Sequence, residues 1–237
     1  MKENEVEKGL LLSPPLKSGE PVPNSRIIEL CKKSNDLLYP VLTVEPEKKN
    51  VQSSLQAARG YKGYVKAFKI RLGYVPVYAD DSVFDPIYDY AEKEQLPVMF
   101  HTGDTATSTG SLRHSHPLTI DPLANTRPDM RIVICHFGNP WISDVGELLY
   151  KHPNVFADIS GLVAGDGAKY AQKYMEALAN KLSDAIYFAG GADKLIFGTD
   201  YPVETFTAGL SLLRKLKIDQ EDIAKISRLN ALKVFFS

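Results

Sequence analysis

The stretch PVMFHTGDT, residues 97–105, carries the pattern on which the fold prediction depends. A short apolar run leads directly into a histidine, and a glycine and an aspartate follow closely. Short apolar runs of this kind are typical of strands that are buried on both faces of a parallel sheet. His101 would then stand at the carboxyl end of a strand, where it either packs as a strand end or takes part in chemistry.

Six further runs of this kind are spread along the chain: GLLLSP (9–14), LLYPVLTV (37–44), YVKAFKIRL (64–72), RIVICH (131–136), NVFADIS (154–160) and KLIFGTD (194–200). Segments with helical spacing separate most of them, which predicts a parallel sheet covered by helices. A closed (β/α) barrel and an open doubly wound sheet both fit this order. The open sheet usually has a Gly-rich phosphate turn after its first strand, and SPPLKSGEP at 13–21 is not such a turn. We therefore predict an α/β fold, a TIM-like barrel with about seven parallel strands, as one domain over residues 1–237.

The segments with helical spacing have recognisable ends. They are SRIIELCKK (25–33), SVFDPIYDYAEKEQ (82–95), ISDVGELLYKH (142–152), AKYAQKYMEALANKLSDAIYFA (168–189), TAGLSLLRKL (207–216) and QEDIAKISRLNALKVFF (220–236). Ser82 and Asp219 are residues of the N-cap type at the start of two of them. The segment 13–25 is rich in Pro, Gly and Ser, and it reads as a long loop after the first strand.

Composition excludes several classes of protein. The chain has 237 residues, a formal net charge of −1 and 28 scattered basic residues, which is not the pattern of a nucleic-acid or membrane-surface binder. It has no apolar run long enough to span a membrane, and the charged start MKENEVEK is not a secretory signal. Cys31 and Cys135 lie far apart beside apolar residues, so we expect structural thiols and a cytoplasmic setting.

Three predicted strands end on a residue that can bind metal or move a proton: His101, His136 and Asp200. In both candidate folds, chemistry gathers at the carboxyl ends of the strands. A buried ionisable group is costly unless it is paired or functional, so three such strand ends indicate a site. Structural roles stay open for each, as a loop contact, a core histidine and a helix cap or ion-pair partner respectively.

The two-residue period of a strand adds further candidates. In AFKIRL (67–72), Lys69 and Arg71 share one face, and the apolar residues that alternate with them share the other. Lys69 and Arg71 should therefore point into the barrel, and by the same rule Asp158 and Ser160 share a face. A purely structural charge cluster with Asp158 is the alternative. His152 precedes a strand, and we expect it on the surface at the opposite end.

At these residues the sequence resembles a known family. HTGD (101–104), ICHFGNPW (134–141), NVFADISG (154–161), GTDYP (198–202) and LNALKVFF (229–236) resemble the amidohydrolase-related TIM-barrel metal-dependent hydrolases, the amidohydrolase 2 branch. That branch also contains aromatic-acid decarboxylases. The match runs nearly end to end, and GTDYP together with HTG is the specific part of it.

The resemblance implies roles for the candidates. His101 corresponds to a metal-binding histidine, His136 to the histidine that orients or deprotonates the metal-bound water, with a possible role as a third ligand, and Asp200 to a metal ligand and general base. The implied cofactor is a divalent metal, zinc first, which lowers the pKa of its bound water to about 7. Substrate contacts would come from Lys69, Arg71, Asp104 and Trp141, and a cation there could hold a substrate carboxylate. For Trp141, loop packing is the alternative.

The sequence departs from the family at its start. The family's first strand carries a His-x-His pair of metal ligands, and this chain has no histidine before His101. The resemblance thus implies that the first barrel strand is missing, which makes metal occupancy doubtful because a catalytic zinc usually has three protein ligands. It also leaves exposed strand edges, which segment 13–25 or a second copy of the chain could cover. RHSHPL (113–118) contains His114 and His116, which are either replacement ligands or ordinary loop residues.

Several functions fit these observations. The first is a metal-dependent hydrolase that acts on a small amide, ester or lactone through metal-activated water. A decarboxylase on the same scaffold is a close variant. A catalytically impaired barrel that still binds a small molecule, and a lyase that uses Lys69 as a Schiff-base nucleophile, are the alternatives.

Overall fold

The computed structural model describes residues 2–13, 22–163 and 171–237. Its centre is a seven-stranded parallel sheet in which each strand pairs with the next one along the chain. The strands are β1 (Gly9–Leu11), β2 (Leu38–Val44), β3 (Ala67–Ile70), β4 (Val98–Phe100), β5 (Ile132–Ile134), β6 (Val155–Asp158) and β7 (Leu195–Ile196). Each of them lies within one of the seven predicted runs, so the predicted α/β architecture with seven parallel strands is confirmed.

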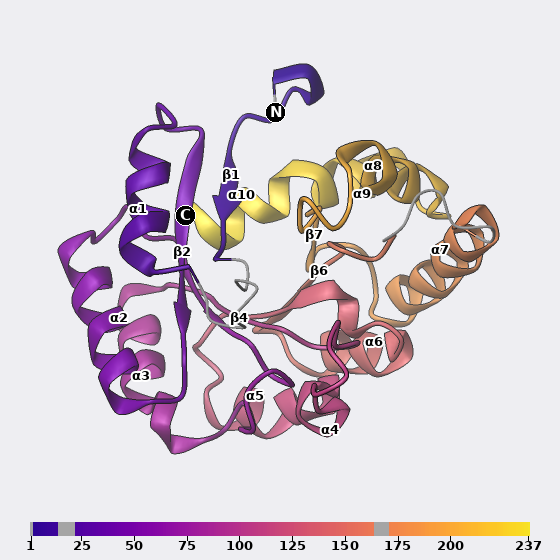
Figure 1. Ribbon diagram of the computed structural model, residues 1–237. Coiled ribbons are helices and arrows are strands. Elements are labelled where there is room, and N and C mark those ends of the chain that lie inside the picture. The colour runs from indigo at the N-terminus through magenta and orange to yellow at the C-terminus, as the bar shows by residue number, and fades with distance from the viewer. Residues whose placement is uncertain (1, 14–21, 164–170) are drawn as a thin grey trace.

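Helices cover the outer side of the sheet (Figure 1). They are α1 (Asn24–Lys32), α2 (Lys48–Gly60), α3 (Asp85–Glu94), α4 (Leu112–Ser115), α5 (Asp121–Thr126), α6 (Ile142–Lys151), α7 (Ala171–Phe188), α8 (Phe206–Lys215), α9 (Gln220–Ala224) and α10 (Asn230–Phe235). Short 3₁₀ turns lie at Lys2–Asn4, Ser82–Phe84, Pro117–Ile120 and Cys135–Gly138. Within the described ranges, no helix is long and apolar enough to cross a membrane.

The sheet curls into a half-barrel, so its two faces differ in what they bury. The outward residues join the large core under the helices, which includes Leu42, Phe68, Ile70, Phe100, Ile132 and Ala157. The inward residues form a second, smaller core, which includes Val41, Ala67, Met99, Val133, Phe156 and Ile196. This division confirms the predicted parity of β3, because Phe68, Ile70 and Leu72 belong to the outer core and Ala67 to the inner one.

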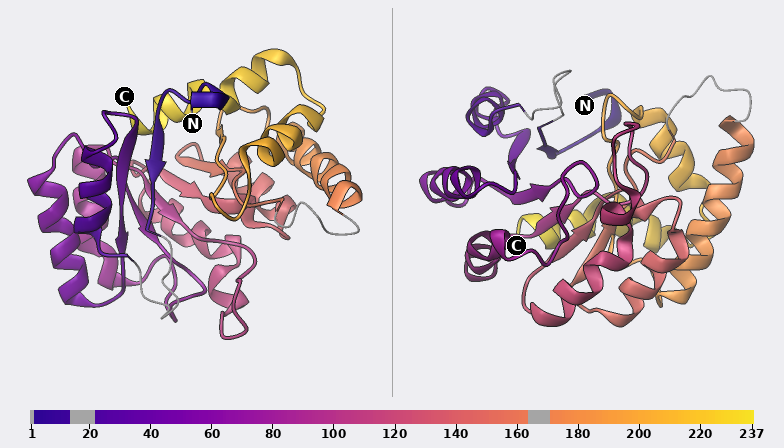
Figure 2. Two further views of the ribbon diagram at one scale, coloured as in Figure 1. Left: turned by 45° about the horizontal axis from the view of Figure 1, so that its top comes forward. Right: turned by 60° about the horizontal axis from the view of Figure 1, so that its bottom comes forward.

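The C-terminal helix α10 closes one end of the curl. Its Val234 and Phe235 pack with the inward residues of the strands, and α10 runs beside β1 in the view of Figure 1. Arg131, just before β5, donates from Nη1 to the carbonyl oxygen of Val234 at 2.8 Å. The closed end is therefore the amino-terminal end of the strands, and the carboxyl ends are left for the site. Figure 2 shows the curl from two further sides.

Hydrogen bonds join the end of β7 to the last helical segment, at a point where that segment changes from α-helical to π-helical geometry. Residues Lys225–Leu229 form one π-helical stretch between α9 and α10, and the Ile226 carbonyl accepts from the amide of Phe197 at 2.9 Å. Asn230 adds two side-chain bonds of 2.7 Å to the carbonyls of Ala192 and Leu195. The predicted cap Asp219 is confirmed, because its carboxylate accepts from the Asp222 amide at 3.0 Å.

The two outer strands of the sheet, β1 and β7, do not pair with each other in the part of the chain that the structure describes. The predicted cover, segment 13–25, lies mostly outside the described residues. At its margins, the Ser13 hydroxyl donates to the Val22 carbonyl at 2.9 Å.

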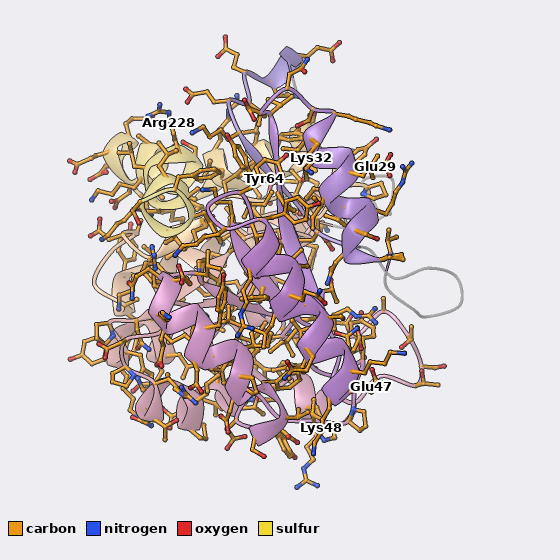
Figure 3. All side chains as sticks on the ribbon, turned by 90° about the vertical axis from the view of Figure 1, so that its left-hand side faces the viewer. Glu29, Lys32, Glu47, Lys48, Tyr64 and Arg228 are labelled. Atoms are coloured by element: carbon orange, nitrogen blue, oxygen red, sulfur yellow. The ribbon has the colours of Figure 1, made fainter. Side chains whose placement is uncertain are left out.

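Three local predictions need correction or addition. Asp81, not Ser82, accepts the capping bond at the start of the 3₁₀ turn, and α3 begins only at Asp85. The predicted surface position of His152 is wrong: only 5% of its surface is exposed, and Asp121 Oδ1, 2.7 Å from its Nε2, gives the buried ring a polar partner. Helix α2 is an element that the pattern missed, since its buried face mixes Val51, Leu55 and Ala58 with Ser54. Figure 3 shows α1 and α2 from outside, with Glu29 and Lys48 among the labelled side chains of this face.

Candidate functional site

His101 and His136 stand next to each other at the carboxyl ends of β4 and β5. Their ring centroids are 4.9 Å apart at an interplanar angle of 60°. The register between the strands, Met99 opposite Val133, fixes this placement. The ring of Tyr74 packs against the other side of His101 with centroids 4.8 Å apart. The structure thus brings the two predicted strand-end histidines together.

His136 is held from two directions by the end of β6. Its backbone is in the left-handed region, with φ 61°, and its amide donates to Asp158 Oδ1 at 2.9 Å. Its ring atom Nδ1 lies 3.0 Å from the Ser160 carbonyl oxygen. Because a carbonyl oxygen only accepts, Nδ1 carries a proton, and in the neutral tautomer the lone pair is then on Nε2.

Asp158 organises this arrangement from inside the barrel. One of its oxygens, Oδ1, accepts from the His136 amide, the Ser160 amide at 3.0 Å and the Ser160 hydroxyl at 2.5 Å. Asp158 is 5% exposed, so its charge is compensated by these donors and not by water. The prediction that Asp158 and Ser160 face the same side is consistent with the bond between their side chains.

Asp200 follows β7 and is exposed, with φ 51°. It meets His136 at Gly161, which has φ +64°. A Cβ on Gly161 would lie 3.1 Å from His136 Nδ1 and 3.3 Å from Asp200 Oδ2. The segments that follow β5, β6 and β7 therefore meet at Gly161. His136 and Asp200 both lie next to this glycine.

Lys69 and Arg71 have separate partners inside the barrel mouth. Lys69 is 8% exposed, and its Nζ lies 2.7 Å from Cys135 Sγ. Arg71 pairs with Glu45, with Nη2 and Nε at 2.9 and 3.1 Å from Oε1. Glu45 was not among the predicted residues, although Val41, Thr43 and Glu45 follow the same two-residue period.

Burial, together with the charged and basic groups around it, keeps the His101 ring neutral. Burial holds the pKa of His101 well below its usual value, and His136, Lys69 and Arg71 lower it further, while the Asp104 carbonyl opposes them. That carbonyl lies 3.0 Å from His101 Nε2 and accepts its proton. Burial, together with the nearby Asp158 carboxylate, raises the pKa of the Cys135 thiol. The lumen thus combines a neutral imidazole, a neutral thiol and two basic side chains.

The other predicted site residues lie on loops around the mouth. The side chain of Asp104 is exposed, and its amide donates to the Asn139 carbonyl at 2.8 Å. Trp141 is half-buried, and its ring packs on His116 with centroids 4.6 Å apart. His114 packs on Tyr78 at 4.6 Å. The rings of RHSHPL thus contact aromatic side chains, not His101 or His136.

The donor set has the right chemistry for a divalent metal but not the right placement. Two imidazoles and a carboxylate are ordinary ligands of such ions. However, no three His, Cys, Asp or Glu side chains in the described ranges come together closely enough to hold a metal. One nitrogen of each histidine is also engaged, His101 Nε2 with the Asp104 carbonyl and His136 Nδ1 with the Ser160 carbonyl. The described residues therefore do not by themselves fit the implied ion.

This geometry can be compared with known proteins. A family model described as amidohydrolase matches residues 20–236, nearly the whole chain. The chain belongs to the amidohydrolase family. The resemblance drawn from HTGD, ICHFGNPW and GTDYP is thereby confirmed at the level of the family. No curated protein matches the chain.

Solved structures share the fold of this chain at low sequence identity. An uncharacterised TIM-barrel protein from Bordetella bronchiseptica is 21% identical over 96% of this chain and 77% of its own, with a TM-score of 0.74. A 2,6-dihydroxybenzoate decarboxylase from Rhizobium is 18% identical over 90% and 75%, with a TM-score of 0.65. A dihydroxybenzoic acid decarboxylase from Polaromonas sp. JS666, with bound manganese, is 15% identical over 90% and 73%, with a TM-score of 0.63. These similarities establish the TIM-barrel type of the fold.

Proposed function

We propose that this protein is a hydrolase that acts on a small molecule carrying a carboxylate, bound at the mouth of the half-barrel. The observation that carries the proposal is the state of His136. Its Nδ1 proton is held by the Ser160 carbonyl at 3.0 Å, so its Nε2 is available as a base. An imidazole that is oriented in this way at the carboxyl end of a strand can act as the base that takes a proton from water during hydrolysis.

The neighbouring side chains suggest the remaining roles. Lys69 and Arg71 are the basic side chains of the mouth and would attract a substrate carboxylate. Asp200, on the other side of Gly161 from His136, would exchange a proton with the leaving group. Asp104 and Trp141 lie on the surrounding loops, where substrate choice is made. Amides, esters and lactones are the bond types in question.

No step of this proposal involves a metal ion, because no three donor side chains in the described ranges lie close enough together to hold one. The expectation of a divalent ion came from the family resemblance. Three of the similar solved structures carry manganese, which gives zinc no preference for this chain. The proposed base chemistry of His136 does not require the ion, and it can be tested with or without it.

The test is a hydrolysis screen of paired small amides, esters and lactones, each with and without a carboxylate, on wild type and His136→Asn. Asparagine keeps a donor near the position of Nδ1 and removes the base at Nε2. We expect turnover of the carboxylate-bearing member only, and a loss of about 10²-fold or more in the variant, the usual contribution of a general base. His114→Asn is the matched control, because His114 packs on Tyr78.

Full activity in His136→Asn would remove His136 as the base. Binding of carboxylates without turnover of any pair would favour the alternative, a barrel that keeps its ligand site and has lost catalysis. Calorimetric titration with the same compounds separates these two results.

Decarboxylation is the second candidate, and the similar solved structures favour it. Several of them are decarboxylases of dihydroxybenzoate or 5-carboxyvanillate. Loss of carbon dioxide from 2,6-dihydroxybenzoate with a labelled carboxyl group is the direct measurement. Release of label by wild type and not by Asp200→Asn would replace the hydrolase proposal with this one.

A further inference from the structure

Lys69 and Cys135 form a very close pair in the lumen. Lys69 Nζ lies 2.7 Å from Cys135 Sγ. That separation is normal for an N–H···O hydrogen bond, which spans about 2.7–3.2 Å. Sulfur is a larger atom than oxygen, so an amine and a thiol that share only a hydrogen stay farther apart. The two atoms are therefore closer than a simple hydrogen bond between them requires.

The fold imposes this closeness. Lys69 is on β3 and Cys135 follows β5, and both strands pair with β4 between them. Cys135 is 1% exposed and Lys69 8% exposed, so packing restricts both side chains. The Thr102 hydroxyl also donates to the Cys135 carbonyl at 2.8 Å. Packing and this hydrogen bond therefore keep the Lys69 amine and the Cys135 sulfur close together.

We propose that Lys69 and Cys135 are an oxidative modification site, at which one oxygen atom bridges Sγ and Nζ. Two single bonds that meet at an angle on an oxygen atom span a separation of this size, so the bridge needs little movement. The sulfenic acid of a cysteine condenses with a backbone nitrogen that is held against it. Lys69 supplies such a nitrogen at the end of a buried side chain.

The reaction balances with hydrogen peroxide as the oxidant. The S–H bond and one N–H bond of the neutral amine break, and one S–O bond and one O–N bond form. Two molecules of peroxide are consumed and three molecules of water are released. One peroxide oxygen stays in the bridge, while sulfur and nitrogen together give up the electrons that reduce the peroxide. A dithiol reductant that cleaves the S–O bond frees the Cys135 thiol and leaves a hydroxylamine on Lys69. A second equivalent of the reductant, which cleaves the N–O bond and releases the oxygen as water, restores the amine.

The bridge would also change the charge of the mouth. A nitrogen bonded to oxygen is a much weaker base than a lysine amine, so the ammonium charge of Lys69 is lost. This consequence rests on the proposed function, because it matters only if Lys69 attracts a substrate carboxylate. The cross-link itself does not depend on that function, and it is measured separately.

The experiment treats the purified full-length chain with peroxide, blocks free thiols with N-ethylmaleimide, and digests it with trypsin for mass spectrometry. A bridged Lys69 resists cleavage, so residues 67–71 should appear joined to residues 132–151. The pair should have gained one oxygen and lost two hydrogens, and dithiothreitol should abolish it. Cys31 is an internal control, because it is also fully buried and makes no side-chain hydrogen bond in the described part of the chain.

Lys69→Met keeps the length of the side chain without the amine, and it should give no joined peptide. Cys135→Ala is a second variant, which should free the Lys69 peptide even if Lys69→Met fails to fold. A Cys135 that remains a thiol, reaches the sulfinic acid, or joins Lys69 without gaining oxygen overturns the proposal. A joined peptide in peroxide-treated wild type, with unchanged affinity for the carboxylate-bearing compounds of the hydrolysis screen, would leave the cross-link standing and count against the role of Lys69 in the proposed function.

Discussion

Ser160 holds the ring of His136 with both its carbonyl oxygen, at 3.0 Å from Nδ1, and its hydroxyl oxygen, at 3.2 Å. The same hydroxyl donates to Asp158 Oδ1, which also accepts from the His136 amide. Backbone and ring of one histidine are thus positioned by two residues at the end of the neighbouring strand. The orientation of the proposed base depends on this short network.

Asp158→Ala should displace the His136 ring, although Asp158 itself has no substrate contact in the proposed function. We expect turnover to fall by up to about 10²-fold with little change in KM, because a base displaced by about 1 Å loses most of its effect. The ¹⁵N shifts of the His136 ring should also change from a single tautomer to a mixture.

The control for this variant is Asp184→Ala, an exposed residue of α7. An Asp158→Ala protein with native ring shifts and native turnover would contradict the positioning role.

Gly103→Ala should be strongly destabilising. Gly103 has φ +93°, and an added Cβ would lie 2.4 Å from the Asn139 carbonyl oxygen. The backbone strain alone costs about 1–3 kcal/mol, and the clash would add to it. Urea unfolding measures the loss.

Gly60→Ala is the matched substitution, since nothing lies within 4 Å of a Cβ there and Gly60 ends α2. We expect it to be neutral or to gain up to about 1 kcal/mol. Equal effects of the two substitutions would be inconsistent with a steric limit at Gly103.

Acid should weaken the contact between Asp121 and the end of α6. Hydrogen bonds from Lys151 and His152 lower the pKa of Asp121 below its ordinary value. A carboxyl group with a depressed folded-state pKa stabilises the fold above the unfolded-state pKa of about 3.9, and this contribution is lost as pH falls through the folded-state value.

Melting temperatures of wild type and Asp121→Asn should therefore differ at pH 6, and the difference should begin to shrink below about pH 3.9 and vanish only below the folded-state pKa of Asp121. Asp129 is an exposed carboxylate with no ion pair in the described part of the chain. The melting temperature of Asp129→Asn should therefore follow that of wild type at every pH. A constant difference between wild type and Asp121→Asn at every pH would refute the linkage.

Metal content follows from the placement of the donors. Because no three-donor group forms in the described ranges, we expect the purified chain to hold clearly less than one equivalent of zinc or manganese. Elemental analysis before and after chelation, on wild type and His101→Ala, is the measurement. One tightly held equivalent that is lost in the variant would show that the donors rearrange around an ion.

Sequence by itself determined the strands and which of their faces turns inward. Runs such as PVMF (97–100) and IVIC (132–135) are apolar throughout, and burial on both faces leaves a parallel strand as the stable choice. The two-residue period then assigned Lys69 and Arg71 to the lumen. These features are local, because strand geometry alone fixes the alternation of side chains.

The tertiary structure decided which residues touch. Glu45 with Arg71, Cys135 with Lys69 and Ser160 with His136 each join different strands, and only the register of the sheet sets those distances. The burial of His152 had the same origin, since its partner Asp121 lies in a separate helix. Pairing across strands is decided by packing and register, which no short stretch of sequence contains.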